Sequence, residues 1–126
     1  MGEYEITGGE GRTRVILSAQ SLGKDFTVFI YNENAHIGAV ALGEPYPSRV
    51  DQNYISPSVS VLTRTAHKED IIARQMASGL ASAMNVPVLV CCGIHLDGIT
   101  PDEIEEINKN SEVLLEKIIA VQERLS

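Results

Sequence analysis

Hydrophobic and polar residues alternate along much of the first half of the chain, as they do in strands with one buried face. Residues 12–20 and 26–31 show this pattern and are joined by turn residues 22–25, which predicts a hairpin. The first strand is expected to turn Val15, Leu17 and Ala19 toward the core, with Arg14, Ser18 and Gln20 mostly on the other face. A short edge strand at residues 3–6 precedes a flexible break at residues 8–11.

Three later segments are also predicted to be strands. Residues 37–42 are uncharged, and their small side chains suit an interior strand in close contact with another backbone. Residues 55–62 alternate apolar residues with serines, and Pro57 places this strand at an edge or makes its start irregular, because proline lacks the ladder N–H. The serine side could be a solvated sheet face or could line a polar pocket. Residues 88–92 carry no charge and predict a central strand buried on both faces.

The next pattern is the helical spacing of apolar residues at about residues 68–84. The side expected to pack on the sheet carries Ile72, Met76 and Leu80. Thr65 or His67 lies near the start of this helix, and Asn85 ends it.

A second helix is predicted from Pro101 to about Leu125, and Thr100 and Glu103 form a capping box at its start. Its apolar positions follow a heptad spacing: Ile104, Ile107, Ser111, Leu114, Ile118, Val121 and Leu125. At 1.5 Å per residue the helix is ~37 Å long, which is long for so small a sheet. The seam therefore packs either wholly on its own sheet or in part on a partner subunit.

Together these elements predict one α+β domain over residues 1–126, because a chain of 126 residues has no room for a second core. We expect two layers, with a largely antiparallel sheet of about five or six strands and two helices packed on it. Short turns between consecutive strands favour antiparallel pairing.

Charge and composition narrow the classes of partner. The net charge of −7 and the absence of Trp argue against nucleic acid and against an anionic membrane. No apolar run is long enough to span a membrane, and the first residues do not resemble a signal peptide. The two cysteines, Cys91 and Cys92, are adjacent in a predicted core strand and are expected to be reduced. These features favour a cytoplasmic protein.

The chain has three histidines, and each lies at the end of a predicted element. His36 precedes a strand, His67 precedes a helix, and His95 follows the central strand close to Asp97. Three interpretations compete. Three imidazoles suit a zinc or iron site, although no pair has local ligand spacing. His95 oriented by Asp97, or His67 by Glu69, suits acid–base catalysis, although no nucleophile motif accompanies them.

The third interpretation is anion binding at the start of the first helix. Arg64, His67 and Lys68 surround that helix start, where free backbone N–H groups favour a phosphate. The chain has neither a P-loop nor a Gly-x-Gly-x-x-Gly motif, so a standard nucleotide-binding fold is not expected.

Residues 35–41, 60–70 and 93–104, in this order, resemble the small accessory proteins of gallate and related hydroxyarylic acid decarboxylases. That family is the prenylated flavin chaperone, LpdD-like, and the resemblance covers about residues 12–120. It implies a non-catalytic helper of UbiD-type decarboxylases that carries, protects or helps to load prenylated FMN. It also implies a fold similar to proteasome-assembly chaperones, which dimerise. The positions that match are His36, Gly38, His67, Lys68, Glu69, His95 and Asp97.

Three hypotheses for the function remain open. The first is a cytoplasmic homodimeric accessory protein that binds prenylated FMN or its UbiD-type decarboxylase. Its site is expected to include His36, His67 and His95, with Lys68 and the helix start meeting the phosphate. The second is a small histidine- or metal-dependent lyase or hydrolase that uses the same histidines. The third is an assembly module in which the histidines only brace the fold.

Overall fold

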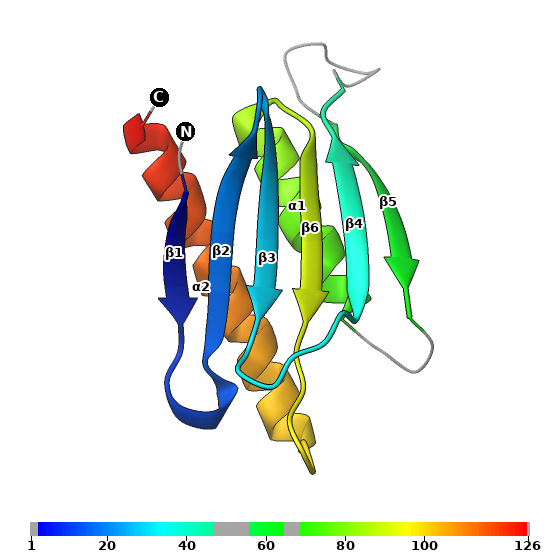
Figure 1. Ribbon diagram of the computed structural model, residues 1–126, viewed down its shortest axis with the longest axis vertical. Coiled ribbons are helices and arrows are strands. Elements are labelled where there is room, and N and C mark those ends of the chain that lie inside the picture. The colour runs from blue at the N-terminus through cyan, green and yellow to red at the C-terminus, as the bar shows by residue number, and fades with distance from the viewer. Residues whose placement is uncertain (1–2, 47–55, 65–68, 126) are drawn as a thin grey trace.

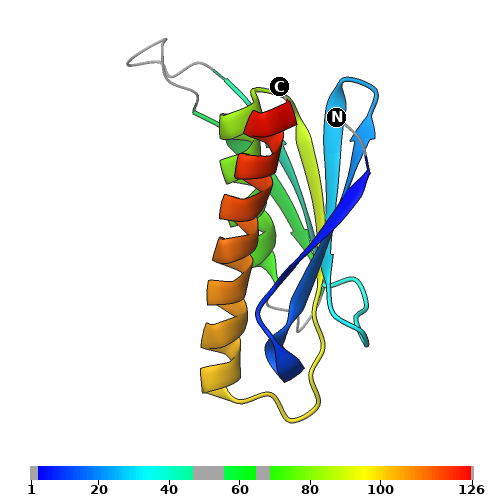
Figure 2. The ribbon, with the colours of Figure 1, turned by 90° about the vertical axis from the view of Figure 1, so that its left-hand side faces the viewer.

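The computed structural model describes residues 3–46, 56–64 and 69–125. One layer is a six-stranded sheet, and the other consists of two helices that lie on the same face of that sheet (Figures 1 and 2). The elements are β1 (Tyr4–Gly8), the 3-10 turn η1 (Gly11–Thr13), β2 (Val15–Leu22), β3 (Asp25–Tyr31), β4 (Ala39–Glu44), β5 (Ser58–Thr63), α1 (Asp70–Met84), β6 (Val88–Gly93) and α2 (Pro101–Leu125). The predicted α+β class with two layers is confirmed.

The strand order in the sheet is β1-β2-β3-β6-β4-β5 (Figure 1). The β3–β6 pair is parallel and every other neighbouring pair is antiparallel, so the sheet is largely antiparallel as predicted. The parallel β3–β6 pair arises because β4 does not pair with β3. The uncharged β6 enters between them and becomes the third strand from the β5 edge.

Alternation correctly predicts which residues of the first hairpin are buried, since Val15, Leu17 and Ala19 all lie in the core. The interior strand β4 begins at Ala39, two residues later than predicted, because the preceding residues cross over the end of β6. The strand β5 lies at the sheet edge, and its serines Ser58 and Ser60 are exposed. The serines therefore form a solvated face.

The prediction that β6 is buried on both faces is wrong. Val88, Val90 and Cys92 are fully buried beneath the helices, whereas Leu89 on the other face is 37% exposed and Cys91 is half-buried. Both helices lie on one face, so the other face of the sheet has no covering layer within the described residues (Figure 2). The apolar run of β6 therefore supplies core on one side and an open apolar surface on the other.

The heptad seam of α2 packs inside the chain along its middle. Ile107, Ser111, Leu114 and Ile118 are buried in contact with the sheet and α1, whereas the seam residues near the ends, Ile104 and Leu125, are exposed. Of the two expectations for this seam, the structure supports packing on the chain's own sheet. Within the described ranges, no helix combines the length and the apolar character needed to cross a bilayer.

The helix ends agree with the predicted signals wherever the structure describes them. Asn85 adopts the left-handed conformation (φ 56°) and its N–H donates to the carbonyl of Ala81, which ends α1. At α2 the capping box forms, with Glu103 N–H donating to Thr100 Oγ1 (3.2 Å) and Thr100 N–H to Glu103 Oε1 (3.0 Å). The suggested start of the first helix near Thr65 or His67 lies outside the described residues.

Glu103 also accepts a hydrogen bond from Arg12 Nε at 2.6 Å, which ties α2 to η1. The hydrogen bond from Arg12, followed by that from the Thr100 backbone, lowers the pKa of the Glu103 carboxyl from its usual 4.5. A carboxyl with a lowered pKa stabilises the fold above its unfolded pKa, and this stabilisation is lost as the pH falls through the folded value.

We expect Glu103→Gln to weaken the dependence of stability on pH below about 4.5, because the glutamine cannot bind the extra proton of the unfolded state. Urea unfolding at about pH 6 and about pH 3 measures this dependence. Glu112→Gln, on the exposed face of the same helix, is the matched control. Equal acid sensitivity in wild type, Glu103→Gln and Glu112→Gln would contradict the assignment.

Candidate functional site

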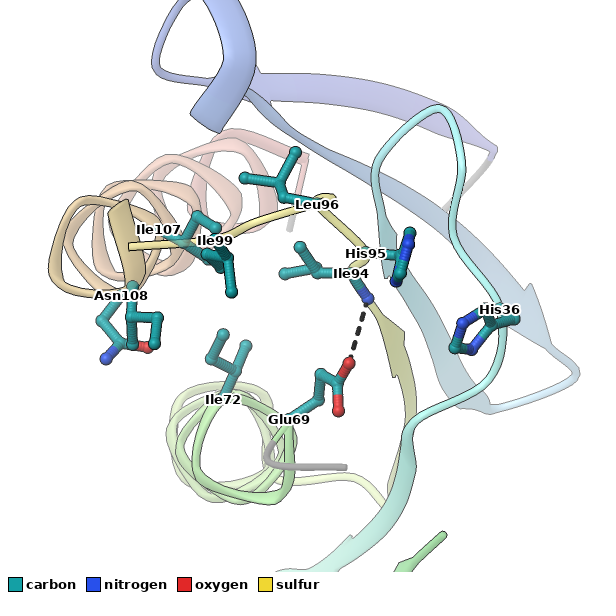
Figure 3. A pocket seen from close by; sticks show the side chains of 10 residues that line it. His36, Glu69, Ile72, Ile94, His95, Leu96, Ile99, Ile107 and Asn108 are labelled. Carbon is teal, nitrogen blue, oxygen red and sulfur yellow. Dashed lines mark hydrogen bonds between the residues drawn. The ribbon is translucent and has the colours of Figure 1, made fainter. Parts of the chain in front are cut away.

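The pairing of the central strands brings several predicted site residues to one end of the molecule. Because β3 and β6 are parallel, their carboxyl ends meet at the same edge, and the antiparallel β4 begins there. His36 lies in the β3–β4 connection, His95 directly follows β6, and Glu69 precedes α1 (Figure 3). These three side chains come from distant parts of the sequence and gather at the end of β6.

The β3–β4 connection lies against the end of β6 at very short range. A Cβ atom added at Gly93 would collide with the carbonyl oxygen of His36, so only glycine fits there. Gly38 N–H donates to the carbonyl of Cys92 at 2.9 Å, and Arg64 N–H donates to the carbonyl of Gly38 at 2.9 Å. The backbone that carries His36 is therefore fixed on both sides.

The imidazoles of His36 and His95 face each other with ring centroids 5.3 Å apart and a tilt of 39°. Asn32 holds the backbone of His95 with two hydrogen bonds, from Asn32 Nδ2 to the carbonyl (2.8 Å) and from His95 N–H to Asn32 Oδ1 (3.1 Å). The ring of His95 contacts Asp97 through Nε2 and Oδ1 at 2.9 Å. The Asp97 side chain is 95% exposed, so water screens this pair strongly.

Glu69 turns its carboxylate inward, toward β6 (Figure 3). Its Oε1 accepts a long hydrogen bond from Ile94 N–H (3.4 Å), and a side chain at Gly38 would collide with the carboxylate. Burial, and then the charge of Glu69, raise the pKa of the Cys92 thiol. Burial also raises the pKa of Cys91. Both cysteines are therefore neutral thiols at neutral pH, in line with their predicted core role.

A cavity of about 290 Å³, here called the first pocket, opens between the start of α1, the β6–α2 connection and the first turns of α2 (Figure 3). Its polar lining residues are His36, Glu69, His95 and Asn108, and its apolar ones are Ile72, Ile94, Leu96, Ile99, Ile104 and Ile107. Such a mostly apolar chamber with a few polar groups is typical of sites for organic ligands.

A second pocket of about 430 Å³ lies on the open face of the sheet, beneath the β3–β4 connection. Phe29, Tyr31 and Cys91 contribute to its floor, and His36 lines both pockets. His36 therefore stands between the first pocket and the open face of the sheet.

The structure brings five of the predicted site residues together at this end: His36, Gly38, Glu69, His95 and Asp97. Arg64 is exposed and its Nη1 donates to the carbonyl of Ile37 (2.9 Å), so it braces the connection and is not among the lining residues of the first pocket. His67 and Lys68 lie outside the described residues. Within the described ranges no three His, Cys, Asp or Glu side chains are grouped to hold a metal ion.

Sequence reasoning misses the aliphatic walls of the first pocket and the role of Asn32. The walls come from α1, the β6–α2 connection and α2, and each residue alone fits an ordinary core pattern. The sequence predicts Asn32 only as a turn residue, whereas its hydrogen bonds to His95 join residues that are far apart in sequence.

Gly93→Ala is expected to destabilise the fold by about 1–3 kcal/mol, the usual cost of forcing volume into a packed site, because the added methyl meets the backbone of His36. At Gly38 the added methyl would meet only the flexible end of Glu69, so Gly38→Ala should cost less. Adding Glu69→Ala should relieve part of the Gly38→Ala cost and none of the Gly93→Ala cost. Urea unfolding of the single and double variants measures both effects, and equal relief at the two glycines would contradict the geometry.

A search of curated protein sequences finds no match to this chain. Among solved structures, a chain from the "Crystal Structure of a Novel Chaperone Complex for Yeast 20S Proteasome Assembly" is similar in fold, with a TM-score of 0.59 and 16% sequence identity over 98% of both chains. At that identity the similarity shows the fold alone. A family model described as the prenylated flavin chaperone LpdD-like domain matches residues 9–123, nearly the whole chain. The resemblance predicted from the three sequence segments is thereby confirmed, and this protein belongs to the prenylated flavin chaperone LpdD-like family.

Proposed function

We propose that the protein is a non-catalytic cytoplasmic helper that holds prenylated FMN and passes it to a UbiD-type decarboxylase. The observation that carries this proposal is the first pocket, an apolar chamber edged by paired histidines in a member of the prenylated flavin chaperone family. The two free cysteines suit the reducing cytoplasm.

The chemistry of the first pocket fits the prenylated ring system of the cofactor. That ring system is flat and largely apolar, with polar atoms along one side, and the six aliphatic residues would cover the apolar part. The carboxylate of Glu69 can accept a hydrogen bond from a flavin N–H, and the imidazoles of His36 and His95 can stack or hydrogen-bond at the pocket edge. About 290 Å³ suits the ring system rather than the whole cofactor, so the ribityl phosphate would extend outside the chamber.

A carrier must also leave its cargo unreacted. The thiols near the site are protonated because burial raises the pKa of both Cys91 and Cys92, so neither is a ready nucleophile toward a bound flavin. The aliphatic residues of the first pocket would also cover part of the ring against water. These features support a holding role.

Ile104→Ser is expected to weaken binding of prenylated FMN by about tenfold, the effect of losing roughly half of an isoleucine's contact area. Ile104 lines the first pocket and is 45% exposed, while Val113 on the same helix is 41% exposed and does not line it. Val113→Ser is therefore the matched control and should bind like wild type. Titration followed by flavin fluorescence, with FMN as a second ligand, measures the affinities.

Saturable binding that Ile104→Ser weakens and Val113→Ser does not would support the pocket assignment. Equal affinities in all three proteins would contradict it. His36→Ala and His95→Ala then test whether the paired histidines belong to the same site. An absence of flavin binding combined with stoichiometric zinc or iron would instead favour the histidine-dependent enzyme.

The proposal also includes a homodimer, formed through the open face of the sheet rather than through α2. The centre of this face carries Phe29, Leu89 and Leu42, all partly exposed and all uncharged. The charged residues of β3, β4 and β6 are Asp25 and Glu44, which lie at the strand ends remote from the site. A large exposed apolar area of this kind is typical of a protein interface.

Charge favours the same surface. Each chain carries a net charge of −7, so two copies repel each other unless they meet through an uncharged area. The outward face of α2 does not offer one, since its exposed residues include Glu105, Glu112, Glu116 and Glu123. The uncharged centre of the open sheet face would let two copies meet without placing carboxylates opposite each other.

Leu42→Glu is expected to convert dimers into monomers, because it places two carboxylates in an apolar contact. Leu42 and Val113 are each 41% exposed, but Val113 lies on α2, so Val113→Glu is the matched control and should remain dimeric. Sedimentation equilibrium measures the masses, and unfolding in urea confirms that both variants are folded. A monomeric Val113→Glu beside a dimeric Leu42→Glu would place the interface on α2.

A further inference from the structure

A third pocket, of about 260 Å³, lies at the same end of the molecule as the paired histidines. We call it the arginine pocket. Its lining residues are Gly11, Arg12, Arg14, Ile16, Asn32, Glu33, Asn34 and Leu96. Of the three pockets described at this end, it alone is lined by arginines.

The two arginines of this pocket differ in their contacts. Arg12 is fixed, since its Nε donates to Glu103 at 2.6 Å and its Nη2 donates to the carbonyl of Asp97. The guanidinium of Arg14 makes no hydrogen bond or ion pair with any residue that the structure describes. Its backbone is nevertheless held, because its N–H donates to the carbonyl of Gly11 (3.2 Å). Arg14 therefore presents its donors from a fixed backbone, without a hydrogen-bond or ion-pair partner among the described residues.

The arginine pocket lies next to the proposed flavin site, because the two have lining residues in common. Leu96 lines both the first pocket and the arginine pocket, while Asn32 and Glu33 line both the second pocket and the arginine pocket. Asn32 is the residue that holds the backbone of His95. A ligand whose ring lies beside the histidines can therefore extend a tail past Leu96 toward Arg14.

The alternative place for a phosphate, the start of α1, carries the wrong charge in its described part. Glu69 and Asp70 stand at that helix start, and their carboxylates oppose the attraction of the free N–H groups for an anion. Glu33 is the one carboxylate among the lining residues of the arginine pocket, which also include Arg12 and Arg14, and Glu103 pairs with Arg12 from outside that lining. Two guanidinium groups thus balance two carboxylates at the arginine pocket, whereas the described part of the α1 start has two carboxylates, so the comparison favours the arginine pocket.

We propose that the arginine pocket is a phosphate subsite in which Arg14 binds the phosphate and Arg12, held in place by Glu103, lines the pocket beside it. The proposal rests on the proposed function to the extent that the phosphate is that of prenylated FMN. Guanidinium groups bind phosphate oxygens through paired N–H donors, which suits an arginine whose donors have no partner in the described part of the chain.

The first test uses inorganic phosphate and the full chain, and requires no flavin. Phosphate should produce saturable amide shifts at residues 11–14 and 32–34 in a ¹⁵N NMR titration. Arg14→Gln should abolish them, while Arg74→Gln, which removes an exposed arginine of α1 that lines none of the three pockets, should not. Shifts that survive in Arg14→Gln, or that never appear, would overturn the assignment.

The second test compares prenylated FMN with its dephosphorylated form. In the wild type and in Arg74→Gln the phosphate should improve affinity by about tenfold, the size of one charge-assisted hydrogen bond, and in Arg14→Gln this advantage should disappear. If prenylated FMN binds Arg14→Gln about tenfold more tightly than its dephosphorylated form does, the phosphate subsite is wrong, but the proposed flavin binding stands. Phosphate shifts at the arginine pocket without binding of either flavin would retain the subsite and refute the proposed function.

Discussion

The site end of this molecule depends on the close approach of the His36 backbone to Gly93. With a hydrogen instead of a side chain at position 93, the β3–β4 connection can lie directly on the end of β6. This contact allows Gly38 N–H to bond to the carbonyl of Cys92, and it sets the start of the β4–β6 pairing. It also brings the imidazole of His36 against that of His95. The pairing of the two histidines and the start of the β4–β6 pairing therefore both depend on one position without a Cβ.

Much of the fold could be predicted from local pattern. Alternation located the strands, the four-residue spacing located the helices, and the capping box at Thr100 and Glu103 formed as expected. Pattern failed where it had to say what covers an apolar residue. The uncharged β6 was predicted to be buried on both faces, but the helices cover only one of them. For the seam of α2, the pattern did not distinguish between the chain's own sheet and a partner subunit, and the middle of the seam packs on the chain's own sheet.

The candidate site was predictable only in part, for a related reason. Histidines at the ends of elements stood out because polar residues there tend to converge, and His36 and His95 do lie together. The isoleucines that wall the first pocket looked like ordinary core residues, because their common role depends on how α1 and α2 meet at β6. Arg14 looked like one residue of a polar strand face, and the gap beside it is visible only in three dimensions.

The central position of β6 has a consequence for how the chain acquires its structure. Strands β1–β3 form one antiparallel ribbon, and β4 and β5 form another. Among the residues that the structure describes, strand pairing joins the two ribbons only through β6. During synthesis β6 emerges after both ribbons and after α1, so β3 and β4 each have one unpaired edge until β6 is made. Its docking closes the sheet between residues far apart in sequence, such as Phe26 and Val88. The sheet is therefore continuous only when its last strand is in place.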